Sequence, residues 1–308
     1  MDRITWQEVL LPLFPGKVSE ALKRVGDEGD LLEIRLRRGL PMQLVYPARD
    51  RLLYAPNGRA MMDGQDCEQL LLRICENSVY AWSDELQNGF ITLQGGYRVG
   101  ISGRAVSEQG RMTRFSEVNS FNFRIVREVR GAAKTLVEAV RGEDGRLFST
   151  LIVSPPGLGK TTLLRDLVRH ASYGIGLRAQ RVALVDERFE LAGCVRGLPM
   201  FDVGPRTDIM SGMRKAQAMR RMLAAMSPEV IATDELFFLD DIEAVLTAKA
   251  NGVTVLASAH GGGYSDLLLR KPMEKLIRNG IFQRIAELSE VGRIAKVVDE
   301  KGKEVEFG

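Results

Sequence analysis

The spacing of apolar residues in the first half of the chain predicts mostly β-strands. Apolar and polar residues alternate in 31–46 and 121–129, and the segment 90–102 alternates on both sides of a glycine pair. Alternation with a period of two indicates strands that bury one face, and a glycine pair between two of them indicates a hairpin. Apolar residues at helical spacing predict a helix over 67–75. We therefore predict an N-terminal α+β domain over 1–138.

After a polar, glycine-rich stretch at 139–147, continuous apolar runs alternate with longer segments of helical spacing. The predicted strands are 148–153, 181–185, 230–233 and 253–257, and the predicted helices are 160–171, 210–226, 240–250 and 272–279. Strands that alternate with helices of this length are typical of βαβ units and a mainly parallel sheet. The sequence therefore predicts an α/β protein, with a second domain over 139–308 that ends in a hairpin near Lys301 and Gly302.

The composition is that of a globular protein, with 45% hydrophobic and 27% charged residues among 308. The 43 basic and 40 acidic residues nearly cancel, so the net charge of +3 points to no class of partner. The three cysteines show no metal-ligand spacing, which suits a reducing compartment. No signal peptide is apparent, and no apolar run approaches the ~20 residues that span a bilayer. We expect a cytoplasmic protein.

The segment SPPGLGKTT stands between a predicted strand and a predicted helix, as a phosphate-binding P-loop does. Ser154 replaces the first glycine of the G-x-x-x-x-G-K-[ST] pattern. Backbone N–H groups in such a loop form an anion-binding nest at a helix N-terminus. Lys160 would reach the β- and γ-phosphates, and the Thr161 hydroxyl would bind Mg²⁺. The alternative is a turn that opens an ordinary helix. The candidate nucleotide-binding residues are Ser154, Pro155, Pro156, Gly157, Leu158, Gly159, Lys160, Thr161 and Thr162.

Acidic residues follow two later predicted strands: Asp186, Glu187 and Glu190 after the first, and Asp234 and Glu235 after the second. Ligands bind at the carboxyl ends of strands in an open parallel sheet. Carboxylates there can hold Mg²⁺ through water or polarise an attacking water molecule. We select Glu190 and Glu235 as catalytic candidates, the alternative being solvated loop residues or helix N-caps. The division of roles among the five stays open.

His260 closes an apolar strand next to three glycines. An imidazole at this position could bond the γ-phosphate and report its loss to a neighbouring subunit. The alternative is a loop histidine that bonds a carbonyl oxygen. The other histidine, His170, lies within the helix predicted after the P-loop, and we interpret it as structural.

Taken in order, SPPGLGKTT, VDERFE, IATDEL and ASAHG resemble the four motifs of the secretion ATPase superfamily. Longer strings such as GGYRVGISGRAV and GPRTDIMSGMRKAQAM are similar to the stage III sporulation AA family of endospore-forming bacteria. The resemblance implies a RecA-like P-loop NTPase core and Mg²⁺-dependent ATP hydrolysis in a hexameric ring. It also implies a place in the mother-cell cytoplasm, where a membrane-embedded partner docks the ATPase to the channel between mother cell and forespore.

The same resemblance implies roles for single residues. Lys160 and Thr161 match the Walker A lysine and Mg²⁺ ligand, and Glu190 matches the water-orienting acid of the aspartate box. Glu235 matches the Walker B glutamate, which holds Mg²⁺ through water, and His260 matches the histidine box.

Motors of this class also use arginines of the N-terminal domain or of a neighbouring subunit to neutralise the γ-phosphate. Arg124 and Arg127 are our candidates, although alternating strands place arginines on solvated faces by default. In the aspartate box, Arg188 stands where secretion motors usually carry proline, which leaves the placing of Asp186 and Glu187 open.

A nucleic-acid-stimulated RecA-like ATPase is the alternative function, because the segment 213–223 is basic and such clusters follow phosphates. It lacks interleaved aromatic residues for base stacking, so we expect no nucleic-acid partner.

Overall fold

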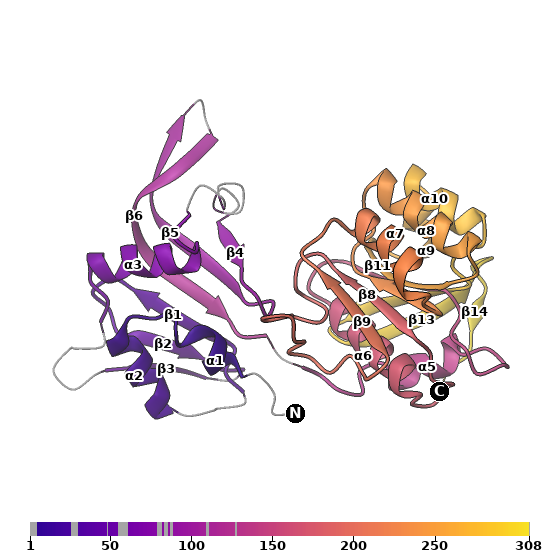
Figure 1. Cartoon of the computed structure of the whole chain (residues 1–308), viewed down its shortest axis with the longest axis horizontal. Coiled ribbons are helices and arrows are strands. Elements are labelled where there is room, and N and C mark those ends of the chain that lie inside the picture. The colour runs from indigo at the N-terminus through magenta and orange to yellow at the C-terminus, as the bar shows by residue number, and fades with distance from the viewer. Residues whose placement is uncertain are drawn as a thin grey trace. The chain divides into compact units, whose positions relative to one another are not determined.

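The computed structural model describes residues 5–25, 30–47, 49–54, 61–78, 82, 86, 89–108, 111–126 and 128–307. The chain folds into two compact units (Figure 1). The first comprises Met1–Arg127 with Val195–Met200, and the second comprises Glu128–Cys194 with Phe201–Gly308. The first boundary between the units thus falls at residues 127–128, before the predicted start of the second domain at 139. The short segment Val195–Met200, from later in the chain, belongs to the first unit.

The first unit is built on a six-stranded antiparallel sheet in the order β3-β2-β1-β6-β5-β4. Apolar residues alternate along its strands, so Ile34 and Leu36 are buried beside the helices while their neighbours are less covered. Residues 121–124 of the strand predicted over 121–129 form the end of the longer β6, which pairs with both β5 and β1, while 125–126 and 128–129 are not strand. The strands are β1 (Glu33–Arg37), β2 (Met42–Val45), β3 (Asp50–Leu53), β4 (Phe90–Thr92), β5 (Arg98–Glu108) and β6 (Arg111–Arg124), and the helices are α1 (Trp6–Leu10), α2 (Gly16–Val25) and α3 (Gly64–Ile74).

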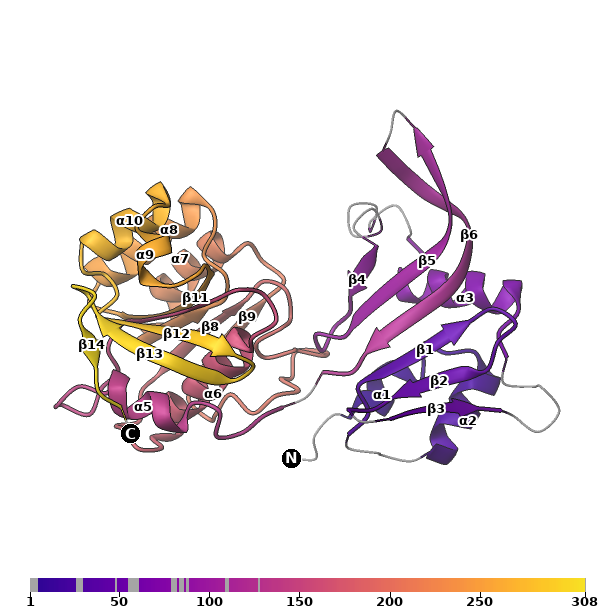
Figure 2. The same cartoon turned by 180° about the vertical axis from the view of Figure 1, so that it is seen from behind.

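The second unit has an eight-stranded sheet in the order β14-β13-β12-β7-β11-β10-β8-β9 (Figure 2). The strands from β12 to β9 in this order run parallel, and β13 and β14 add an antiparallel edge. The strands are β7 (Thr150–Ser154), β8 (Val182–Asp186), β9 (Thr207–Ser211), β10 (Val230–Thr233), β11 (Thr254–His260), β12 (Arg284–Glu290), β13 (Arg293–Asp299) and β14 (Glu304–Val305). The helices are α5 (Lys134–Val140), α6 (Lys160–Tyr173), α7 (Lys215–Met226), α8 (Leu239–Ala250), α9 (Tyr264–Leu267) and α10 (Lys271–Arg278).

Most of the predicted elements of the second unit are present, but the helix predicted over 210–226 is wrong at its start. Residues 207–211 form β9, which pairs with β8, and the helix begins only at Lys215. Between the strand and the helix, Gly212 turns the backbone with a φ of +70°, a conformation that glycine adopts without strain. In the sequence Met210 fits the helical spacing equally well, because an apolar residue at a strand end cannot be told from one on the buried face of a helix.

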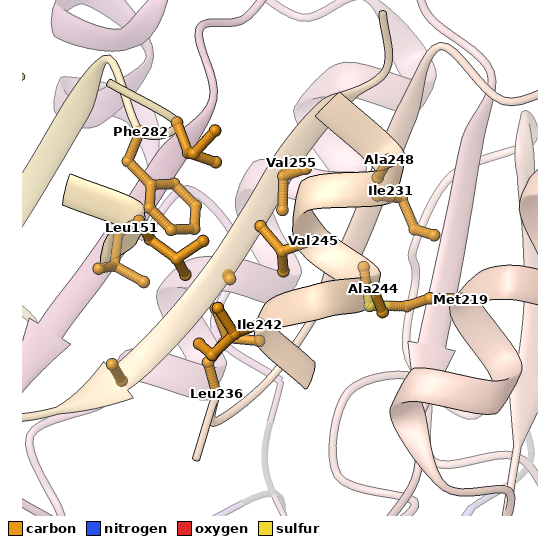
Figure 3. Close-up of a cluster of buried hydrophobic side chains, with 14 of the residues drawn as sticks. Leu151, Met219, Ile231, Leu236, Ile242, Ala244, Val245, Ala248, Val255 and Phe282 are labelled. Atoms are coloured by element: carbon orange, nitrogen blue, oxygen red, sulfur yellow. The ribbon is translucent and has the colours of Figure 1, made fainter. Parts of the chain in front are cut away.

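The parallel strands bury both faces, which explains why they read as continuous apolar runs. Leu151, Ile231, Val245 of α8 and Phe282 belong to one buried hydrophobic cluster, in which Leu151 lies beside Phe282 (Figure 3). Ile152, next along the chain, faces the opposite cluster with α5 and α6. Each such side chain contributes on the order of 1.5–3 kcal/mol on burial. Helices therefore cover both faces of the sheet and fix the positions of its strand ends.

The carboxyl ends of β7, β8, β10 and β11 meet at one edge of this sheet because these strands are parallel neighbours. Ser154 at the end of β7 lies in register with His260 at the end of β11. Thr233 at the end of β10 lies in register with Val185 on β8 and with Ala257 on β11. The segments that carry the predicted chemistry therefore leave the sheet side by side.

Candidate nucleotide-binding site

The loop between β7 and α6 turns sharply at two glycines with positive φ, as the sequence pattern predicts. Gly157 and Gly159 take φ of +82° and +93°, which other residues rarely adopt. A Cβ atom on Gly157 would meet nothing within 4 Å, so open space lies against the loop. The N–H of Gly292, in the turn between β12 and β13, donates to the Leu158 carbonyl at 2.9 Å. The loop is thus braced from one side and open on another.

Lys160 begins α6 and folds back into the loop, where it is only 5% exposed. Its Nζ donates to the carbonyl oxygens of Ser154 at 2.9 Å and Pro155 at 3.0 Å, and lies 3.0 Å from Nδ1 of His260. Burial lowers the pKa of Lys160, and the charge of Glu235 partly offsets this effect. An ammonium group with its three donors engaged therefore lies inside this loop.

His260 connects this lysine to Glu235. An ammonium can only donate, so Nδ1 of His260 accepts from Lys160 and Nε2 carries the hydrogen. Nε2 lies 2.8 Å from Oε1 of Glu235, whose Oε2 is 3.1 Å from Nη1 of Arg188. A cavity of about 530 Å³, lined in part by these last three side chains and Phe237, opens beside them. The sequence-predicted Lys160, Glu235 and His260 thus form one hydrogen-bonded chain next to open space.

The backbone around Glu235 is strained and pinned on both sides. Glu235 has a φ of +32°, which is unfavourable for a residue with a Cβ atom. Its N–H donates to the Ser258 hydroxyl at 2.9 Å, and the Leu236 N–H donates to the Ser258 carbonyl at 2.8 Å. On the other side, Nζ of Lys215 donates to the carbonyl oxygens of Asp234 at 2.7 Å and Glu235 at 2.6 Å.

Asp234 is 2% exposed and carries a perturbed carboxyl group. Burial raises the pKa of Asp234 to about 6, and the charges of Glu190, Asp186 and Glu235 add to the rise while Lys215 opposes it. Within the part of the chain that the structure describes, its Oδ1 has no hydrogen-bond partner and lies 3.6 Å from Nζ of Lys215. The end of β10 is therefore a place where negative charge is concentrated and costly to bury.

Asp186 has a structural role in the loop after β8. Its carboxylate, fully buried, accepts hydrogen bonds from the backbone N–H groups of Glu190, Leu191, Ala192 and Gly193 at 2.8–3.1 Å. Both oxygens thus serve to shape the loop that carries Glu190.

Glu190 is held at this edge through its main chain. Arg165 on α6 is 4% exposed and donates to the carbonyl oxygens of Glu190 and Leu191. Burial lowers the pKa of Arg165 to about 10, although nearby charges including those of Asp186 and Glu190 raise it. The Arg165 guanidinium lies 3.9 Å from the ring centroid of Phe201. Sequence reasoning missed Arg165 because a helical arginine is exposed by default.

Lys215 was also missed, although the sequence contains a signal for it. It precedes Met219 and Met222 by four and seven residues, so it lies on the buried stripe of α7. Its backbone N–H donates to Oε2 of Glu187 at 3.3 Å, and its Nζ is 3.9 Å from the same oxygen. Lys215 therefore joins the ends of β8 and β10.

The oxygen donors at this edge suit Mg²⁺ better than a softer metal. Thr161 and Thr162 follow Lys160 in the first turn of α6, and the Glu235 carboxylate is partly exposed. Among the described residues no group of three or more His, Cys, Asp or Glu side chains could hold a metal ion. Mg²⁺ usually keeps several water ligands and takes one or two protein oxygens with substrate phosphates.

The remaining candidates lie elsewhere or are structural. Arg124 lies on β6 of the first unit with its side chain 64% exposed, and its Nε is 3.7 Å from Oε1 of Glu33. Arg127 lies outside the described residues. His170 is buried, and its Nδ1 is 2.9 Å from the Ile175 carbonyl oxygen, as expected for a structural histidine.

The sequence matches the protein family described as "Sporulation stage III, protein AA" over residues 7–305. The chain belongs to this family. It is 35% identical over 297 residues to "Stage III sporulation protein AA" of Bacillus subtilis (strain 168), covering 94% of each chain.

Solved structures show the same fold at low identity. The ATPase DotB of Legionella pneumophila matches 95% of this chain and 79% of its own, with a TM-score of 0.60 and 14% identity. The pilus retraction motor PilT with bound ADP matches 96% and 82%, with a TM-score of 0.58 and 16% identity. The predicted fold class is confirmed: an N-terminal antiparallel sheet and a mainly parallel sheet, in the fold of these solved structures. In the described parts, no helix has the length and apolar character needed to span a bilayer.

Proposed function

We propose that this chain binds and hydrolyses ATP with Mg²⁺ at the loop between β7 and α6. The observation that carries the proposal is the hydrogen-bonded chain from Lys160 through His260 to Glu235, set beside a glycine loop with open space against it. A turn with a purely structural role does not require a buried ammonium that is hydrogen-bonded through an imidazole to a carboxylate.

Binding requires Lys160 to exchange acceptors. Its ammonium now bonds the carbonyl oxygens of Ser154 and Pro155, which are neutral. Phosphate oxygens carry negative charge and are stronger acceptors, and main-chain N–H groups at the start of α6 favour anions at the same place. A triphosphate over Gly157 therefore draws Lys160 out of its contacts and away from Nδ1 of His260.

Hydrolysis needs a carboxylate to orient water and cations to stabilise the phosphates. Glu235 and Glu190 supply the carboxylates, and one of them orients the attacking water. The oxygen of this water bonds the γ-phosphorus while the bond from the γ-phosphorus to the bridging oxygen of ADP breaks. The water proton passes to the carboxylate or to the departing phosphate. His260, released by Lys160, keeps donating from Nε2 to Glu235. A second proton on Nδ1 would make this nitrogen a donor to a phosphate oxygen. Bound Mg²⁺, held by Thr161 and through water by Glu235, would neutralise charge on the phosphate oxygens.

The proposed working form is a homo-oligomeric ring of six copies, in which Arg124 and Arg127 contribute positive charge at the nucleotide of a neighbour. Membership of the sporulation family supports a role in endospore formation, with the ring docked in the mother-cell cytoplasm on a membrane-embedded channel protein. An exposed apolar segment also supports assembly, because such patches mark protein contacts. It is formed by Phe237, Phe238 and Leu239, which are 74%, 64% and 68% exposed.

Phosphate release measured at rising protein concentration tests the proposal. We expect Mg²⁺-dependent turnover by the wild type, with a rate per chain that climbs as rings form, and none in EDTA. Lys160→Ala should lose both binding and turnover. Lys275→Ala, on the exposed side of α10, should behave as the wild type. Nucleotide affinity that is unchanged in Lys160→Ala would refute the site, and a rate raised by single-stranded DNA or RNA would favour the nucleic-acid-stimulated alternative.

A further inference from the structure

Lys215 is a buried cation whose surroundings are unusual for a structural lysine. It is 7% exposed, and its Nζ donates to the main-chain carbonyl oxygens of Asp234 and Glu235 and lies 3.6 Å from Oδ1 of Asp234. Lysines are rarely buried because desolvation of the ammonium is costly. The free N–H groups at the start of α7 would need only a small capping residue. We therefore attribute the buried ammonium of Lys215 to the segment that it hydrogen-bonds, Asp234 and Glu235.

We infer that Lys215 is a positioning residue for ATP hydrolysis, which holds the strained turn at Asp234 and Glu235 so that the Glu235 carboxylate faces His260. The inference rests on the proposed function. It assigns Lys215 no contact with the nucleotide: the lysine acts through the backbone of the residue that bears the carboxylate.

The geometry shows why the turn needs a clamp. With φ at +32°, Glu235 sits in a region that disfavours side chains with a Cβ atom, so the free backbone would return to negative φ. Ser258 fixes the N–H side of this turn, and Lys215 fixes the carbonyl side. Both hydrogen bonds of Lys215 are charge-assisted and shorter than 2.8 Å.

Release of the carbonyl side changes where the carboxylate points. Rotation about φ of Glu235 moves its carbonyl and, with the Ser258 bond in place, swings the Cα–Cβ direction. The 2.8 Å contact between Glu235 and Nε2 of His260 requires the present direction. A displacement of about 1 Å at a catalytic group costs on the order of 10²-fold in rate.

Lys215 also ties this turn to the end of β8. Its backbone N–H donates to Glu187, and its ammonium lies 3.9 Å from the same carboxylate oxygen. Lys215, the first residue of α7, thereby links the segment after β8, which carries Glu187 and Glu190, to the turn that carries Glu235. This link holds the two segments at a fixed spacing.

The test compares Lys215→Met with Lys249→Met in the full-length protein. Lys249 is a half-buried lysine at the end of α8 that bonds Gln283 at 3.3 Å. We expect Lys215→Met to lower single-turnover hydrolysis of radiolabelled ATP by about 10²-fold while its affinity for ATP stays within about threefold. Lys249→Met should change neither quantity. Hydrolysis by Lys215→Met within threefold of the wild type would overturn the inference.

A double-mutant cycle separates positioning from general destabilisation. In a Glu235→Gln background, Lys215→Met should cost little further rate, because the group that it orients is already gone. A loss that multiplies fully with that of Glu235→Gln would overturn the inference. If Lys215→Met does not fold by circular dichroism, Lys215→Leu, which likewise has no hydrogen-bond donor, is read in the same way. Absence of hydrolysis by the wild type would instead refute the proposed function itself.

Discussion

Asp186 offers the sharpest test of how the site is built, because one side chain shapes the whole loop after β8. In Asp186→Asn the side chain keeps its size, but one of its two oxygens becomes an NH₂ group. Each carboxylate oxygen now accepts two backbone N–H bonds. The amide can therefore satisfy one pair, while the other pair faces a donor.

The expected cost follows from that count. Hydrogen bonds to a charged group contribute about 1.5–3 kcal/mol each, so two lost bonds weaken the fold by about 4 kcal/mol. For a unit of this size each kcal/mol moves the melting temperature by about 2–4 °C, which predicts a fall of about 8–16 °C. The exposed Asp208 on the neighbouring strand β9 provides the matched control, Asp208→Asn, which should leave the melting temperature unchanged.

Two signals report the two units separately. Both tryptophans, Trp6 and Trp82, lie in the first unit. Calorimetry of Asp186→Asn should therefore show the lower transition while the tryptophan fluorescence melt stays in place. A calorimetric transition within about 2 °C of the wild type, less than 1 kcal/mol by the same conversion, would refute the structural role given to Asp186.

Three further predictions concern the site and its support. Glu190→Gln should retain ATP and lose turnover, and a normal rate measured by phosphate release would assign the catalytic role to Glu235 alone. His260→Phe should bind ATP with little change but hydrolyse it about 10²-fold more slowly, because a proton-donating group is lost; an unchanged rate would remove His260 from the mechanism. Burial raises the pKa of Asp166, but hydrogen bonds from His170 and the Ala133 N–H outweigh it and lower the pKa overall. Asp166→Asn should therefore be about 1–3 kcal/mol less stable at pH 7, with the difference disappearing as the pH falls below about 4; denaturation curves with an equal gap at both pH values would contradict this.

Local patterns predicted much of this structure, because the relevant forces act over short stretches of chain. The P-loop glycines and the apolar runs of the parallel strands have their effect within a few residues. The carboxyl ends of parallel strands must meet at one edge, so Lys160, Glu235 and His260 could be expected together.

Other features depended on contacts that are distant in sequence. Asp186 looks like a site acid until the four N–H groups around it are seen, and Arg165 looks like a solvated helical residue. The last two residues of β9, 210–211, fall in the helix predicted over 210–226, because only the pairing of β9 with β8 identifies them as strand. The burial of Lys215 could have been predicted, since it lies on the buried stripe of its helix. Its hydrogen-bond acceptors on Asp234 and Glu235 could not, because they are distant in sequence.

The most direct test is a crystal structure of the protein with Mg²⁺ and a non-hydrolysable ATP analogue. The account predicts a triphosphate against the main chain of 157–161, with Nζ of Lys160 moved from the Ser154 and Pro155 carbonyl oxygens onto phosphate oxygens. An analogue bound elsewhere, with that ammonium still on its two carbonyls, would contradict the account.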